Sequence, residues 1–167
     1  MAHEQLVLPL RVISLGDAMR LKRELEVLND YAHQTELRQS GAEPKTLPKP
    51  SSALNDLAQE NSLNLLKTED REAAIAFLGN LVESAPQVHI SFASEPSSIF
   101  MAKITSWFRD RIDPILLINV GLEPSIAAGF TLRTLNHYHD FSLRQQFSDQ
   151  RELLLNGIRE SQATEPL

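Results

Sequence analysis

The chain has 167 residues, a formal net charge of −6 and a sequence pI of about 5.3. An acidic chain lacks the basic surface that holds phosphate backbones, which argues against nucleic-acid binding. The absence of cysteine excludes disulfides, thiolate metal sites and a cysteine nucleophile. No apolar run approaches the roughly 18 residues of a membrane-spanning helix, so we expect no direct membrane insertion.

The N-terminal part predicts a strand followed by a long helix. Residues 5–14 are largely apolar, and Pro9 favours an edge strand because it cannot donate a backbone hydrogen bond. Ser14 and Asp17 have the spacing of a capping box, which predicts a helix from there to about Gln39.

Apolar positions in this predicted helix recur at spacings of three and four, which places them on one face. They are Ala18, Leu21, Leu25, Leu28 and Ala32. Such a stripe is explained by packing on the chain's own sheet. The alternative is a seam for a partner helix, centred on Leu21, Leu25 and Leu28.

The next part of the chain predicts a linker and two helices. Residues 40–52 contain three prolines and a glycine, which indicates an extended linker. A short helix is expected after Ser52. A longer one is expected from Thr68, where acidic side chains suit the positive end of the helix dipole.

The remaining sequence alternates strands and helices. Residues 87–93 alternate apolar and polar side chains, which predicts a half-buried strand. A helix after Pro96 has Trp107 on its apolar stripe, so we expect Trp107 in the core. Residues 115–122 are near-continuously apolar, which is typical of a central strand. Residues 130–140 predict a further strand, and residues 142–157 a last helix.

The expected element order is β-α-linker-α-β-α-β-β-α. This order predicts an α/β (α+β) sandwich, in which a small mixed sheet is packed by helices. The expected organisation is a strand–helix unit, a linker with a short helix, a compact C-terminal domain and a tail. These cover residues 1–39, 40–67, 68–160 and 161–167.

Motifs that carry chemistry are sparse in this chain. It has no glycine-rich phosphate loop and no Gly-x-Ser-x-Gly elbow. The sequence therefore indicates no catalytic residue, no cofactor and no metal site. The polar cluster His137, His139 and Asp140 could serve a small enzyme of ferredoxin-like shape, but surface histidines are the simpler interpretation. The charged run from Arg109 to Asp113 is interpreted as a surface cluster of salt bridges.

Residues 122–147 carry the most specific pattern in the chain. They resemble the signature near the C-terminus of the ATP synthase delta subunit, whose mitochondrial relative is the oligomycin-sensitivity-conferring protein. The matching positions are Glu123, Pro124, Ser125, Gly129, Arg133, Asp140, Ser142 and Arg144. Three positions depart from the family pattern, because Ala128, Leu135 and Phe141 stand where it has glycine.

Ordinary chain geometry accounts for much of this pattern. Pro124 and Ser125 are expected to turn the chain out of a strand, and Gly129 to allow a close backbone approach. Asp140 or Ser142 is expected to cap the last helix.

The resemblance implies a non-catalytic stator subunit of an F-type ATP synthase. Its partners would be the peripheral-stalk helices, with head subunits as further candidates. Its role would be mechanical, holding the head against rotor torque during proton transport and ATP synthesis. The location implied is cytoplasmic, at the membrane through the complex. Residues 1–68 do not follow the family's N-terminal helical bundle, which docks on the catalytic head. The alternative hypothesis is a diverged α/β protein-interaction module that serves another assembly.

Overall fold

A computed structural model of the chain describes residues 6–37, 49–126 and 128–144, together with 148, 150–151 and 155–156. Within these residues the chain has four α-helices and a four-stranded mixed sheet, which confirms the expected α/β class. The chain divides into two compact units. Unit 1 comprises residues 1–87 and 98–119, and unit 2 comprises residues 88–97 and 120–167.

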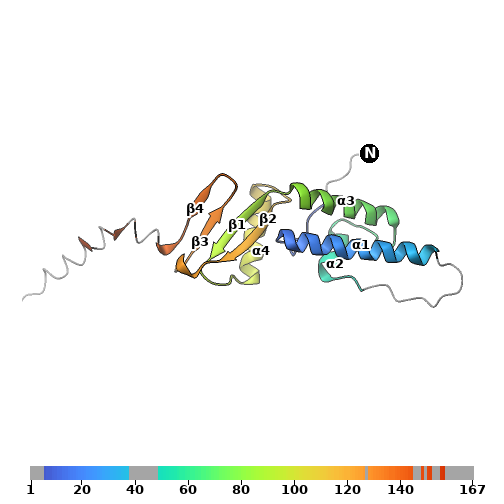
Figure 1. Ribbon diagram of the computed structural model, residues 1–167, viewed down its shortest axis with the longest axis horizontal. Helices are drawn as coiled ribbons and strands as arrows, with labels where there is room; N and C mark the ends of the chain where they lie inside the picture. Colours follow the sequence, from blue (N-terminus) through green and yellow to red (C-terminus); the bar gives the residue numbers. More distant parts are fainter. Residues whose placement is uncertain are drawn as a thin grey trace, which may run out of the picture. The chain divides into compact units, whose positions relative to one another are not determined.

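Three helices of unit 1 lie side by side (Figure 1): α1 (Leu15–Leu37), α2 (Ser52–Glu60) and α3 (Thr68–Ser84). The predicted starts of α2 and α3 are confirmed. The predicted capping box of α1 is also confirmed. Asp17 Oδ2 accepts the Ser14 amide at 2.9 Å, and Ser14 Oγ accepts the Asp17 amide at 3.2 Å. The predicted end of this helix near Gln39 and most of the predicted linker lie outside the described residues.

The apolar stripe of α1 lies in the core of unit 1. Leu21, Leu25 and Leu28 are at most 5% exposed. They belong to one apolar cluster with side chains of α2 and α3, including Leu54, Leu57, Leu78 and Leu81. The stripe is therefore core, and it packs mainly on helices rather than on a sheet. Because these leucines are buried, they offer no exposed seam to a partner helix.

The predicted N-terminal strand is wrong, because residues 6–14 form an irregular segment with a turn. Leu8 and Val12 are buried, and the Val12 amide donates to the Pro9 carbonyl at 3.0 Å. The carbonyls of this segment are satisfied by different elements. The Ile118 amide of β2 (Leu117–Leu122) donates to the Ile13 carbonyl at 2.8 Å, and one side chain satisfies three other carbonyls. Arg109 of α4 (Ser98–Arg111) donates to the carbonyls of Leu8 and Pro9 at 3.1 and 2.9 Å, and to that of Val12.

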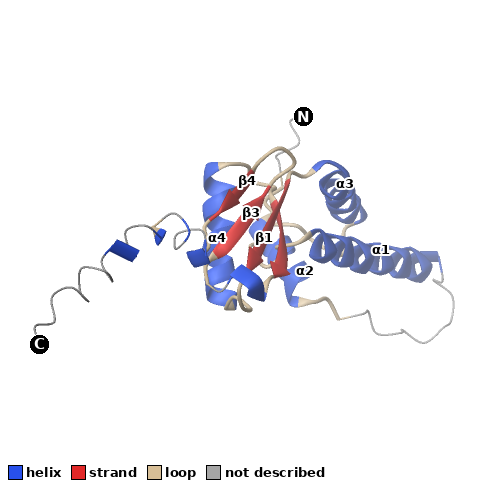
Figure 2. Cartoon of the chain, turned by 60° about the vertical axis from the view of Figure 1, so that its left-hand side comes forward, coloured by secondary structure: helices blue, strands red, loops and turns tan. Residues whose placement is uncertain are grey.

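The sheet has the strand order β2-β1-β3-β4. Its strands are β1 (Gln87–Phe92), β2 (Leu117–Leu122), β3 (Phe130–Arg133) and β4 (Tyr138–Asp140). β3 pairs antiparallel with β1 and with β4, as Figure 2 shows. β2 lies at an edge, so the prediction of a central strand is wrong. Its first residues, Leu117 and Ile118, are fully buried, whereas exposure alternates towards its end. Its apolar composition therefore reflects core packing at one end only.

Residues 130–140 form a hairpin rather than the single strand predicted. The Thr134 amide donates to the His137 carbonyl at 2.9 Å and closes the turn between β3 and β4. The predicted final helix, residues 142–157, lies largely outside the described residues.

Helix α4 turns a different face inward from the one predicted. Trp107 is 57% exposed, whereas Met101, Thr105, Phe108 and Arg109 are buried. Arg109 is therefore not part of a surface salt-bridge cluster. The helix carries apolar side chains on more than one face, so spacing alone does not decide which face is inward. No described helix has the length and apolar character to cross a membrane.

Candidate functional site

The residues that match the delta-subunit pattern lie in unit 2. The chain leaves β2 through a 3₁₀ turn, η1 (Pro124–Ile126), as Pro124 and Ser125 led us to expect. Two hydrogen bonds fix this turn: the Glu123 amide donates to the Phe92 carbonyl at 2.8 Å, and Ser125 Oγ donates to Glu123 Oε1 at 3.0 Å. The first three motif residues thus shape the exit from the edge strand.

Gly129 makes the close backbone approach that the pattern predicts. Its φ is +95°, and a Cβ built on it would lie 2.4 Å from the Phe141 carbonyl oxygen. The Leu143 amide donates to the Ala128 carbonyl at 2.9 Å, so the two segments are held together at this point. Among the described residues, the only non-glycine with positive φ is Ser62. Ala128, Leu135 and Phe141, which stand where the delta-subunit pattern has glycine, therefore have no positive φ.

Asp140 and Ser142 form a local cap after β4. Asp140 Oδ1 accepts the Ser142 amide at 2.8 Å. Hydrogen bonds from the Ser142 side chain and amide, with the nearby charge of Arg144, lower the pKa of the Asp140 carboxyl below its ordinary value. The Asp140 carboxylate therefore already accepts a hydrogen bond from the neighbouring backbone.

One face of the sheet in unit 2 is polar. Across β1, β3 and β4, the register aligns His89, Arg133 and Tyr138 in one row. It aligns Ser91, Thr131 and Asp140 in the next row on the same side. Because side chains alternate along a strand, these six residues project to the same side. The other side carries Val88, Ile90, Phe92, Phe130 and Leu132. We call the side of His89, Ser91, Thr131, Arg133, Tyr138 and Asp140 the polar face.

A glycine of β2 makes room for the imidazole on this face. His89 Nε2 lies 3.2 Å from Ser91 Oγ. A Cβ on Gly121 would lie 2.8 Å from His89 Nε2 and 3.0 Å from Ser91 Oγ, so no other residue fits there without displacing the ring. Our sequence interpretation did not identify His89, Ser91 or Gly121 as functional. The usable signal was the alternation within residues 87–93, which separates His89 and Ser91 from their apolar neighbours.

The predicted cluster of His137, His139 and Asp140 does not converge. The two imidazoles do share a face, with ring centroids 6.2 Å apart. His139 is paired with Leu132 and therefore lies on the apolar side of the sheet, whereas Asp140 is paired with Thr131 on the polar face. Among the described residues, no group of three histidine, aspartate or glutamate side chains could hold a metal ion.

No family model matches this chain, and no curated protein matches it. The functional assignment therefore rests on the residues themselves.

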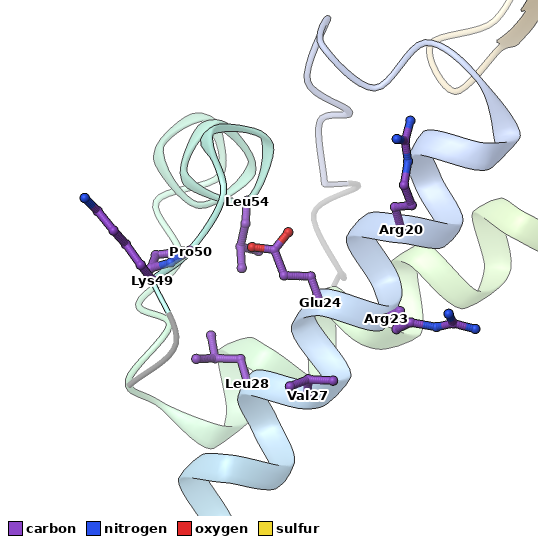
Figure 3. A pocket seen from close by; sticks show the side chains of 8 residues that line it. All are labelled: Arg20, Arg23, Glu24, Val27, Leu28, Lys49, Pro50 and Leu54. Carbon is purple, nitrogen blue, oxygen red and sulfur yellow. The ribbon is translucent and has the colours of Figure 1, made fainter. Parts of the chain in front are cut away.

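Unit 1 contains a hollow of about 320 Å³ beside α1, shown in Figure 3. Its lining residues are Arg20, Arg23, Glu24, Val27, Leu28, Lys49, Pro50 and Leu54. Glu24 points towards residues 49–54 and holds them, because it accepts the Ser51 amide at 2.6 Å and the Ser51 hydroxyl at 2.7 Å. The hollow thus combines apolar walls with a carboxylate that is already engaged. Such a lining suits apolar contact better than acid–base chemistry.

Arg109 of α4 is buried, with 8% of its surface exposed, and its pKa is perturbed. Burial lowers the pKa of its guanidinium to about 10, and the charge of Glu60 opposes this shift. Its acceptors are all backbone carbonyls, including that of Leu116 at 3.2 Å. Arg109 therefore holds the N-terminal segment in place and is not directed at a ligand.

Proposed function

We propose that this protein is a non-catalytic, delta-like stator subunit of an F-type ATP synthase. In this role it links peripheral-stalk helices to the catalytic head and resists rotor torque during proton-driven ATP synthesis. It would act at the cytoplasmic side of the membrane, through the complex.

The observation that carries the proposal is the coherence of the delta-like pattern. The residues that match it as a sequence also act together as a structure: they form the turn after β2, the positive-φ glycine and the cap after β4. The pattern also extends without a gap over residues 122–147.

Surface properties are compatible with a mechanical role. Trp107 of α4 and Ile112, which follows it, are 57% and 59% exposed. Exposed apolar side chains of this kind can contact the apolar face of a partner helix. A stator needs such contacts and needs no reactive centre.

The test is a pull-down of the tagged full-length chain from its own detergent-solubilised membranes, with the bound chains identified. Recovery of ATP synthase stalk and head subunits in fixed ratio supports the stator role. Recovery of none, while the intact synthase is present in the same extract, contradicts it. The Gly129→Val variant disrupts the motif and should lose whatever partner the motif serves.

A second hypothesis is a diverged interaction module of another assembly. It is favoured by the described residues among 6–84, which form an irregular segment and three helices rather than the expected family bundle. The same pull-down separates the two hypotheses, because this one predicts a reproducible set of partners without synthase subunits.

A further inference from the structure

The polar face of the sheet has the chemistry of a recognition site. We propose that it binds a carboxylate of a protein partner, carried by an acidic side chain. Arg133 is the principal binding residue, and His89 and Tyr138 are supporting hydrogen-bonding groups. The inference does not depend on the stator role, because it rests on residues that the strand register of this chain brings together.

The register brings these groups close together. His89 and Arg133 are direct neighbours on antiparallel strands, and Arg133 and Tyr138 are the next pair along the same row. Side chains in such pairs have Cβ atoms about 4.5–5.5 Å apart. An imidazole, a guanidinium and a phenol therefore stand in one row, and all three residues are exposed. Ser91 lies beside this row, with its hydroxyl at the His89 ring.

The chain provides no carboxylate for Arg133 among its described residues. The ion pairs found there involve Arg11, Arg20 and Lys22 instead. The acidic residue on the same face, Asp140, accepts the Ser142 amide. Glu123, at the exit of β2, accepts the Ser125 hydroxyl. Among the described residues, therefore, none pairs a carboxylate with the Arg133 guanidinium, and Arg133 is exposed.

Charge complementarity selects a carboxylate in preference to a polyanion. The planar guanidinium binds a carboxylate through two parallel hydrogen bonds. A nucleic acid needs several cations in an extended footprint, whereas this face has one arginine on a chain of net charge −6. An acidic side chain of a protein matches one guanidinium flanked by an imidazole and a phenol.

Gly121 on β2 shapes the polar face, because the absence of a side chain there makes room for the His89 ring. It leaves the space into which the His89 imidazole extends, towards Ser91. An alanine there would displace the ring and change the face without altering any charge. Binding should therefore depend on Gly121 although it has no side chain.

The test is an NMR titration of the ¹⁵N-labelled full-length protein at constant ionic strength. The probe is an acetylated, amidated Ala-Glu-Ala-Glu-Ala peptide. The reporters are the Arg133 Nε–Hε signal and the amides of β1, β3 and β4. We expect saturable shifts confined to these signals, and none with the Ala-Gln-Ala-Gln-Ala peptide. Arg133→Gln should weaken binding about tenfold or more, because it removes a charge-assisted pair.

Arg111→Gln is the matched control, since Arg111 is an exposed arginine on α4 and the charge change is the same. Equal losses in the two variants would show a non-specific charge effect and overturn the proposal. Gly121→Ala should weaken binding while the net charge stays constant. If that variant fails to fold, His89→Gln makes the same test. Inorganic phosphate that bound more tightly than the peptide, through Arg133, would also overturn the assignment to a protein carboxylate.

Discussion

Gly129 and two buried arginines show how single residues direct the backbone of this protein. Gly129 adopts a φ of +95° against the Phe141–Ser142 backbone. Arg71 is 1% exposed and donates to Asn29 Oδ1 at 2.8 Å and to the carbonyls of Leu65 and Leu66, each at 3.0 Å. Arg71 and Arg109 both meet neutral oxygen acceptors, so each satisfies loop carbonyls that no secondary structure reaches.

Replacing Gly129 by alanine tests the close approach directly. The new Cβ would meet the Phe141 carbonyl at 2.4 Å in a backbone conformation that alanine disfavours. We expect Gly129→Ala to lower the free energy of unfolding by roughly 1–3 kcal/mol. Urea denaturation at constant m-value measures this change.

Gly79→Ala is the matched control for that substitution. Gly79 lies inside α3, and its added Cβ would meet nothing nearer than Lys22 Nζ at 3.9 Å. The expected effect has the opposite sign, a gain of roughly 0.5–1 kcal/mol from the better helix former. A similar loss in both variants would contradict our account of Gly129.

At the scale of the element, α1 is defined by its first turn and by its buried stripe. Burial acts to raise the pKa of Asp17, but hydrogen bonds from the Ser14 amide and hydroxyl and from Arg20 outweigh it. The pKa therefore lies below its ordinary value of 3.8. A carboxyl with a depressed folded pKa stabilises the protein above its unfolded pKa, and this contribution is lost as pH falls through the folded value.

Asp17→Ala should lower the free energy of unfolding by roughly 0.5–2 kcal/mol at pH 7, because the capping box is removed. For Asp17→Asn, the difference from the wild type should be largest near pH 7. It should shrink as the pH falls below 3.8, where the wild-type carboxyl becomes protonated. Denaturation at several pH values measures both effects. Asp30→Asn, at an exposed position of the same helix, should stay within about 0.5 kcal/mol throughout.

At the scale of the whole molecule, the two units do not follow the order of the chain. Unit 1 takes residues from both sides of β1, and unit 2 is also made of two segments. The sequence-based boundary at residue 68 falls inside unit 1, because α3 packs on α1. The buried face of α3 includes Leu78 and Leu81, which share one apolar cluster with the leucines of α1.

A fragment of residues 68–167 should therefore lose the structure of α3. Each leucine of α3 that is buried in the full chain would be exposed, at a cost of roughly 1.5–3 kcal/mol per side chain. We expect loss of amide-exchange protection over residues 68–84 and reduced helical circular dichroism per residue. Protection equal to that of the full chain would show that residues 68–160 form an independent domain.

The sequence by itself determined the features that depend on near neighbours. The capping box at Ser14 and Asp17, the starts of α2 and α3, the strand at residues 87–93 and the turn at Pro124 all follow from local preferences and spacing. The α/β class followed from their order. The residues matching the delta-subunit pattern were also visible in the sequence, because a family pattern is read position by position.

Tertiary structure decided what depends on distant partners. Residues 6–14 are apolar enough for a strand, yet Arg109, about 100 positions away, takes up the carbonyls of Leu8 and Pro9. β2 is apolar because its first half is buried in the core, and that composition does not reveal an edge position. Trp107 is exposed because α4 turns another face inward. The polar face exists only once the register sets Arg133 beside His89, since cross-strand neighbours are not encoded in spacing along the chain.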